Sequence, residues 1–233
     1  MANQLDLEEQ EQLDQIKHFW KQYGNLITWI LIAMLGAYAA WNGYQYWQRG
    51  QATQAAAMFD EVVRLSSQGD PAKVERAFKD MQERFGGTTF AQQSGLLMAK
   101  LYQEAGKPEE AKSALSWVAE KASDPGYQAI ARLRLAAILA QAKDYSKAMA
   151  LLDGSFPPEF QPLVADRRGD VLMLQDKPVL ARTEYEKAYQ GLDHRSDYRR
   201  LVEIKLTALG AAPQPTSDGV AAAAQASAAE GKK

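Results

Sequence analysis

The chain has 233 residues, a formal net charge of −2 at pH 7, 24% charged residues and no cysteine. The lack of cysteine excludes disulfides, thiol nucleophiles, iron–sulfur clusters and cysteine-ligated zinc. The balanced mixture of charges, without a basic stripe, argues against nucleic acid as a partner.

Residues 1–21 are a polar segment that contains five acidic residues and two lysines. A segment with so few apolar side chains cannot bury enough surface to fold alone. We therefore expect residues 1–15 to be disordered and residues 1–21 to form a tail outside the membrane.

The next segment, residues 22–48, is predicted to be a transmembrane helix because it contains no charged residue. As a helix it would extend about 40 Å, which matches a bilayer with its headgroups. Aromatic side chains cluster at its far end, where an interfacial belt would lie: Trp41, Tyr44, Tyr46 and Trp47. Small residues follow one side and are candidates for packing against partner membrane helices: Gly36, Ala37, Ala40 and Gly43.

A cleaved signal peptide is the alternative for this segment, since residues 37–39, Ala-Tyr-Ala, match the cleavage pattern. The long acidic region before the segment and the aromatic cluster after it favour an uncleaved anchor. Lys17 and Lys21 at one end, against Arg49 at the other, predict a cytoplasmic N-terminus and an exported domain. Because the difference is a single charge, a domain on the cytoplasmic side stays open as an alternative.

Residues 49–87 are predicted to form a helical hairpin. Apolar residues recur at helical spacing on both sides of Pro71, and Gly86 and Gly87 end the second helix. No alternating pattern typical of strands occurs in the sequence.

Residues 88–209 contain one pattern three times. In each copy a small residue is followed three positions later by a large one, and nine positions after that by alanine. The alanines, Ala111, Ala148 and Ala181, are 37 and 33 residues apart, which brackets the period of about 34 residues in tetratricopeptide repeats. The small residues are Ala99, Ala136 and Gly169, and the large ones are Tyr102, Leu139 and Leu172.

Small residues at paired positions let two antiparallel helices approach closely, and the large residues then fill the seam. Turn residues fall after each first helix, at residues 106–108, 143–144 and 176–178. We therefore predict an all-α fold, in which a single N-terminal transmembrane helix is followed by a tetratricopeptide-like α-solenoid. A generic helical bundle is the alternative, because alanine and leucine at helical spacing are common.

The solenoid is expected to end with a capping helix over residues 196–209. Residues 210–233 are rich in alanine and have nothing to bury, so we predict a disordered low-complexity tail.

The residue inventory does not suggest an enzyme. The two histidines, His18 and His194, lack neighbours at metal-ligand spacing, and no nucleotide-binding or nucleophile motif occurs. We expect no catalytic residue, no metal and no cofactor. The remaining possibility is the recognition of partners by stacked helices.

Tetratricopeptide solenoids usually bind partners along the inner face of the first helix of each pair. By analogy, the candidate protein-binding residues are Lys100, Gln103, Asp166 and Asp170. We expect exchange of both aspartates for lysine to weaken partner capture without unfolding the domain. The alternative is that Arg167 and Asp170 simply pair on a solvated surface.

Three motifs extend the argument beyond periodicity. They are K-x-F-W-K-x-Y-G over residues 17–24, A-R-L-R-L-A over residues 131–136, and V-A-D-x-R-G-D over residues 164–170. With the single apolar segment followed by Trp47, they resemble the YfgM family of Gram-negative inner-membrane proteins, the ancillary subunits of the Sec translocon. The resemblance covers about residues 8–209.

This resemblance implies an inner-membrane protein with a cytoplasmic N-terminus, a periplasmic repeat domain and no catalytic residue. Its implied partners are the SecYEG translocon, a PpiD-like periplasmic chaperone and exported client polypeptides, besides the membrane lipid around the anchor. We hypothesise a non-enzymatic adaptor that links the translocon to chaperones. The alternatives are a cell-envelope scaffold that oligomerises through its repeats and a regulator whose domain faces the cytoplasm.

Overall fold

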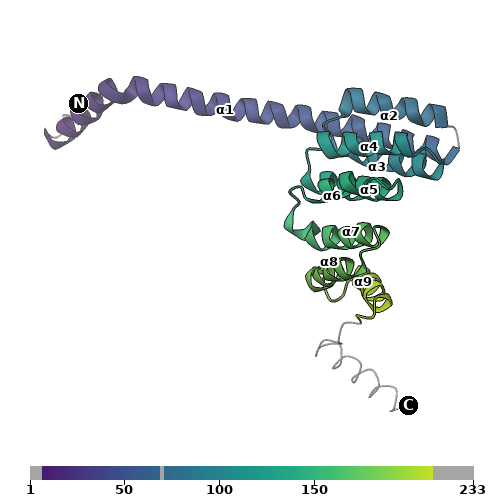
Figure 1. The fold of residues 1–233 in the computed structure, drawn as a ribbon. Helices are drawn as coiled ribbons and strands as arrows, with labels where there is room; N and C mark the ends of the chain where they lie inside the picture. The colour runs from purple at the N-terminus through teal and green to yellow at the C-terminus, as the bar shows by residue number, and fades with distance from the viewer. Residues whose placement is uncertain (1–6, 69–70, 212–233) are drawn as a thin grey trace, which may run out of the picture. The chain divides into compact units, whose positions relative to one another are not determined.

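The computed structural model describes residues 7–68 and 71–211, and every regular element in these ranges is a helix (Figure 1). The elements are α1 (Leu7–Gln68), α2 (Pro71–Phe85), α3 (Thr89–Glu104), α4 (Pro108–Lys121), α5 (Pro125–Gln141), α6 (Tyr145–Leu152), a 3-10 turn η1 (Pro158–Phe160), α7 (Gln161–Leu174), α8 (Pro178–Gly191) and α9 (Asp197–Ala208). The prediction of an all-α fold is confirmed.

The chain divides into two compact units, residues 1–54 and residues 55–233. The division falls inside α1, as do the predicted boundaries after residues 21 and 48, so no helix end marks any of them. The proposed limits of the tail and the membrane segment therefore stay predictions.

The beginning of α1 differs from the sequence prediction. The helix starts at Leu7, so the prediction of disorder is wrong for residues 7–15. The reason is local propensity, because residues 7–23 contain no glycine or proline and many leucine, glutamate and glutamine residues, which favour helix. Residues 1–6 lie outside the described part of the chain.

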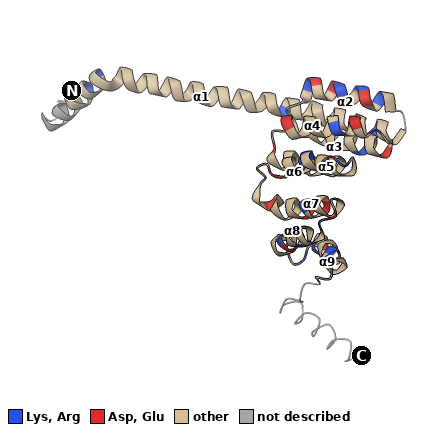
Figure 2. Ribbon diagram, viewed as in Figure 1, with Lys and Arg blue, Asp and Glu red and all other residues tan. Residues whose placement is uncertain are grey.

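Residues 22–48 belong to α1 and carry no charge, as Figure 2 shows. Among the described helices, α1 alone is long and apolar enough to cross a membrane. Within its own unit this stretch leaves large apolar side chains exposed, and Trp29 is 66% exposed. Water solvates such a surface poorly, whereas lipid tails would cover it.

The three predicted repeats are the hairpins α3–α4, α5–α6 and α7–α8. The alanines predicted to mark the second helix of each pair, Ala111, Ala148 and Ala181, are all 0% exposed. Their predicted partners on the first helices, Ala99, Ala136 and Gly169, are also buried. These small residues bring the paired helices together, and the tetratricopeptide-like arrangement is thereby confirmed over a generic bundle.

Larger side chains compensate where the first helix carries glycine. A Cβ added at Gly169 would collide with the ring of Tyr185, and one added at Gly95 would collide with Val118. The bulk that the first helix lacks is therefore supplied by the facing helix, which keeps the interior filled.

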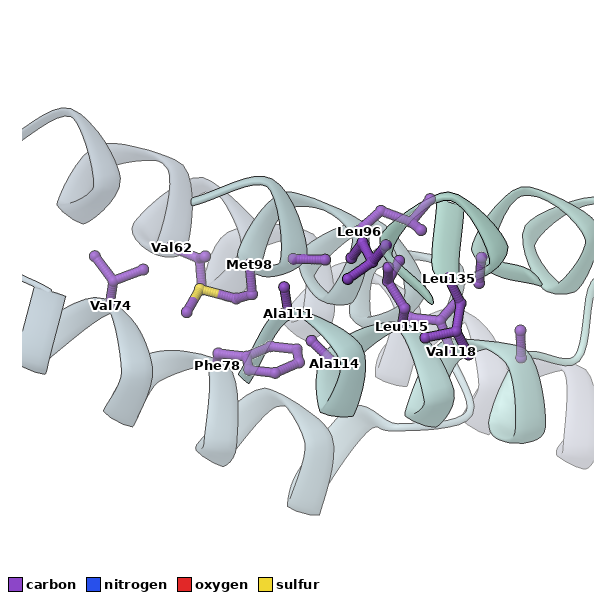
Figure 3. Close-up of a cluster of buried hydrophobic side chains, with 14 of the residues drawn as sticks. Val62, Val74, Phe78, Leu96, Met98, Ala111, Ala114, Leu115, Val118 and Leu135 are labelled. Atoms are coloured by element: carbon purple, nitrogen blue, oxygen red, sulfur yellow. The ribbon is translucent and has the colours of Figure 1, made fainter. Parts of the chain in front are cut away.

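The apolar core continues from one hairpin to the next, as expected of a solenoid. Figure 3 shows its beginning, where Val62 of α1 and Phe78 of α2 lie near Met98 of α3 and Ala114 of α4. Later layers join α5 and α6 to α7, and then α7 and α8 to α9. Val202 and Leu206 of α9 are buried in the last layer.

Each first helix of a repeat ends in the same turn. The residue after the C-cap has a positive φ: 71° at Gly106, 64° at Lys143 and 58° at Asp176. In each case the next backbone N–H donates to a carbonyl five residues back, as from Lys107 to Tyr102 at 2.8 Å. This is the Schellman motif, which satisfies carbonyls that the helix itself leaves unpaired. The predicted turn positions are thus confirmed.

The end of the chain is described only up to Ala211. Gly210 has a positive φ of 71° and closes α9 with the same type of turn. The rest of the predicted disordered tail, residues 212–233, lies outside the described residues.

The positive φ at Lys143 predicts a stabilising substitution. Lys143→Gly should raise the free energy of unfolding by roughly 1 kcal/mol, because glycine adopts this conformation without strain at Cβ. The reverse change at the equivalent turn, Gly106→Ala, should lower it by a similar amount. Urea unfolding of the full chain in detergent micelles, followed by circular dichroism, measures both. Stabilisation by Gly106→Ala would contradict the shared turn geometry.

Candidate partner-binding face

Lys100 and Gln103 lie on α3, the first helix of the first repeat, and both are exposed. Lys100 Nζ is 3.7 Å from Glu104 Oε1, one turn further along the same helix. An exposed ion pair of this kind contributes little to stability, so breaking it to bind a partner costs little free energy. Both side chains are accessible to a partner.

Asp166 and Asp170 lie one turn apart on α7, where Lys205 of α9 contacts both. Lys205 Nζ is 2.7 Å from Asp166 Oδ1 and 2.7 Å from Asp170 Oδ1. The hydroxyl of Tyr198 donates to Asp166 Oδ2 at 2.6 Å, and that of Tyr185 donates to Asp170 Oδ1 at 2.8 Å. We call these five residues the α7–α9 polar cluster.

The α7–α9 polar cluster contributes to stability because part of it is buried. The side chain of Asp166 is 0% exposed, while those of Asp170 and Lys205 are 27% and 23% exposed. A buried carboxylate costs several kcal/mol unless it is paired and hydrogen-bonded. Asp166 has both kinds of partner, and both come from α9. The cluster therefore ties the capping helix to the last repeat.

The two tyrosines donate to carboxylates, and this changes their acidity. Burial raises the pKa of the Tyr185 hydroxyl well above its ordinary value of 10.0, and the negative charge of Asp170 raises it further. Burial likewise raises the pKa of Tyr198, with a second contribution from its hydrogen bond to Asp166. Both hydroxyls therefore stay protonated, and remain donors, throughout the neutral pH range.

These contacts correct the sequence prediction for Asp166. A side chain without exposed surface cannot touch a partner, so Asp166 supports the face but does not belong to it. Exchanging both aspartates for lysine would leave Lys205 beside two further cations, so we expect α9 to detach. Contrary to the expectation from the sequence, this exchange should therefore disrupt the fold at the end of the solenoid.

Asp170 keeps some exposed surface. Its Oδ2 lies 3.2 Å from Arg167 Nη1, so the local pair predicted as the alternative is present. No hydrogen bond or ion pair in the described ranges joins either aspartate to Lys100 or Gln103. The structure thus brings Asp166 and Asp170 together, while the two α3 residues stand apart from them.

Sequence reasoning does not identify Lys205 or Tyr198 as part of this cluster. They lie seven residues apart, which places them on one face of α9, and that spacing is the available signal. Their partner Asp166 is 39 and 32 residues away in the chain. No local pattern predicts such a pairing, because it depends on how α9 returns along α7.

The four small residues Gly36, Ala37, Ala40 and Gly43 lie in the apolar part of α1. A Cβ added at Gly36 or Gly43 would meet nothing within 4 Å. Neither glycine is therefore needed for a close approach inside its own unit.

Within residues 7–68 and 71–211, no group of three or more His, Cys, Asp or Glu side chains is placed to hold a metal ion. His194 Nδ1 lies 2.6 Å from Arg199 Nη1. The guanidinium can only donate, so Nδ1 is the acceptor. This histidine therefore attaches the loop between α8 and α9 to Arg199 of α9.

Comparison with known proteins agrees with this architecture. A family model described as a tetratricopeptide repeat-like domain matches residues 17–211. A Neisseria gonorrhoeae protein named an ancillary SecYEG translocon subunit is 31% identical over 204 residues, which span 87% of this chain and 98% of the relative. Proteins of the same name from Haemophilus influenzae and Escherichia coli are each 26% identical, over 79% and 76% of this chain and 90% and 85% of their own lengths. No solved structure matches the chain.

The buried pairing of Asp166 with Lys205 predicts the effect of removing the cation. Lys205→Met should lower the free energy of unfolding by about 3 kcal/mol, because Asp166 loses its buried counter-charge. Arg182→Met, which breaks an exposed pair with Glu186 on α8, should change it by no more than about 0.5 kcal/mol. Denaturant unfolding of the full-length variants measures both. Equal effects would show that the α7–α9 polar cluster does not carry the stability assigned to it.

Proposed function

Because this chain belongs to the family of ancillary SecYEG translocon subunits and carries a tetratricopeptide repeat-like domain, we propose that it is a non-enzymatic, membrane-anchored adaptor of the Sec translocon. The observation that carries the proposal is 31% identity over 98% of the length of a relative with that name. In this proposal the adaptor links SecYEG to a PpiD-like periplasmic chaperone and assists newly exported polypeptides.

The anchor in this proposal is residues 22–48, and the surrounding membrane lipid covers its exposed apolar side chains. The N-terminal tail lies in the cytoplasm and the repeat domain lies in the periplasm. Lys17 and Lys21 on the tail side favour this orientation. The side of α1 that carries Gly36 and Gly43 offers close backbone approach to a membrane helix of the translocon.

The soluble part of the proposal is recognition by the first helices of the repeats. Lys100 and Gln103 of α3, and the exposed edge of Asp170 on α7, are the contact residues. They supply one cation, one amide and one carboxylate, which suits a polar protein surface better than an apolar ligand. Anchoring raises the local concentration of this face beside the channel, so weak contacts suffice there.

One observation favours a second candidate function, a scaffold that oligomerises through its repeats. The last hairpin and the capping helix expose apolar side chains that a self-complementary surface would bury, among them Val179 at 78% and Ile204 at 65%. Isologous pairing of two such ends would form a closed dimer. The adaptor and the scaffold predict different neighbours in the membrane.

Crosslinking in native membranes separates these two functions. A photoreactive residue at Gln103 should yield adducts with SecYEG subunits or a PpiD-like chaperone, whereas one at Glu120, exposed on α4, should yield few. Gentle solubilisation, affinity purification and mass spectrometry identify the adducts. Adducts of the chain with itself alone would favour the scaffold and contradict the adaptor.

Protease accessibility tests the orientation. Protease added to the outer side of the intact inner membrane should digest the repeat domain and leave a short N-terminal fragment that includes the anchor. A cytoplasmic marker protein that stays intact is the control for membrane integrity. Protection of the repeat domain until the membrane is broken would place it on the cytoplasmic side, as the regulator alternative requires.

A further inference from the structure

A furrow lies between α2 and α4, away from the candidate residues of α3 and α7. It has a volume of about 420 Å³, and α2, α4 and one residue of α3 contribute its walls. Its lining residues are Glu75, Phe78, Lys79, Gln82, Tyr102, Glu110, Ser113, Ala114 and Trp117. None of them belongs to the face assigned to translocon partners above.

The furrow has an aromatic and apolar base. Phe78 of α2 and Trp117 of α4 meet edge to face, with ring centroids 5.9 Å apart. Phe78 lies beside Ala114 in Figure 3, and both residues line the furrow. Tyr102 of α3 is half-buried at the same place. Phe78 is only 6% exposed, so Trp117 and Tyr102, which are half-buried, supply the contact area. Aromatic rings are rigid and give contact area at little entropic cost.

A smaller apolar hollow lies next to the furrow. That hollow has a volume of about 200 Å³ and shares Glu75 and Tyr102 with the furrow. Its other walls include Val74 of α2 and Met98 and Leu101 of α3. Two neighbouring hollows that share the wall formed by Tyr102 suit an extended chain of several residues better than a compact molecule.

Two glutamates near Tyr102 determine which ligand charge the furrow favours. Glu75 and Glu110 are exposed, and within the described ranges neither forms an ion pair, whereas the adjacent Glu109 pairs with Lys112 at 2.6 Å. Both carboxylates act on the hydroxyl of Tyr102. Burial is the largest cause of its raised pKa, and the negative charges of Glu75 and Glu110 raise the pKa further. Two carboxylates beside a tyrosine ring form a site of negative potential.

Lys79 also lines the furrow, and among the ion pairs of the described residues none joins it to Glu75 or Glu110. It follows Glu75 by one helical turn on α2, where an exposed Glu–Lys pair would contribute only a few tenths of a kcal/mol, so a cation of the ligand can compete with it. The carboxylates therefore remain available to a cation from outside.

From this geometry we propose that the furrow between α2 and α4 binds an extended peptide segment in which a lysine or arginine is flanked by apolar or aromatic residues. The cation lies between Glu75 and Glu110 over the ring of Tyr102, where charge and the aromatic face both attract it. The flanking apolar side chains lie on Trp117 and in the hollow beyond Tyr102. This second surface does not depend on the translocon assignment.

The test uses the full chain in nanodiscs of phosphatidylcholine, because anionic lipid would itself bind a cationic peptide. The probes are the fluorescein-labelled peptide GSLFRLSG and its counterpart GSLFELSG, measured by fluorescence anisotropy. The arginine peptide should bind, more weakly as salt is added, and the glutamate peptide should not. Equal binding of the two peptides overturns the proposal.

Paired variants locate the binding. Glu75→Gln with Glu110→Gln should weaken binding of the arginine peptide about tenfold. The matched control, Glu83→Gln with Glu120→Gln, removes the same charge from exposed positions on the same two helices and should leave binding unchanged. Ser113→Trp, at an exposed position that lines the furrow, should block binding without disturbing the core. Unchanged affinity in the first pair or in Ser113→Trp overturns the proposal.

Light scattering on the same samples tests whether a second copy of the chain, and not a peptide, occupies the furrow. If Ser113→Trp converts an oligomer to a monomer, a second copy of the chain fills the furrow and the peptide proposal is wrong. Co-purification of SecYEG with these variants is a separate readout, and its loss or retention bears on the translocon assignment alone.

Discussion

The repeat domain depends on one packing constraint, the close approach of two helices at a pair of small residues. Ala99 with Ala111, and Ala136 with Ala148, lie in shared buried clusters. A larger side chain at these positions would push the helix axes apart, because axis separation follows the size of the contact residues. Every other layer of the solenoid is built outward from these contacts.

The third repeat shows what the same constraint makes possible. Gly169 leaves room for the ring of Tyr185, which crosses it and donates to Asp170. Asp170 and Asp166 in turn pair with Lys205 of α9. The small residue Gly169 in α7 therefore allows the contacts that attach α9 to the last repeat. The end of the solenoid is thus closed by buried charge as well as by apolar contact, which fixes one position of the cap more firmly than leucine packing alone.

Local pattern predicted the hairpins and their turns well, because both depend on residues near one another in the chain. The same reasoning failed at Asp166, which looks like a surface residue beside Arg167 and Arg168. Its burial depends on Tyr198 and Lys205, more than thirty residues later. It also failed at residues 7–15, where polar composition suggested disorder but helix propensity prevailed. The furrow beside Tyr102 was not predicted, since three helices have to meet before it exists.

The sequence by itself determined the helical class, the apolar stretch of residues 22–48 and the repeat period, because each depends on the type and spacing of neighbouring residues. Its motifs also identified the family. Only the tertiary structure decided which charged residues face solvent and which are buried and paired in the interior. Asp166 is buried under α9, whereas Glu75 and Glu110 stay at the surface and form no ion pair with another described residue. That difference follows from long-range packing, which sets the exposure, and so the chemistry, of each carboxylate.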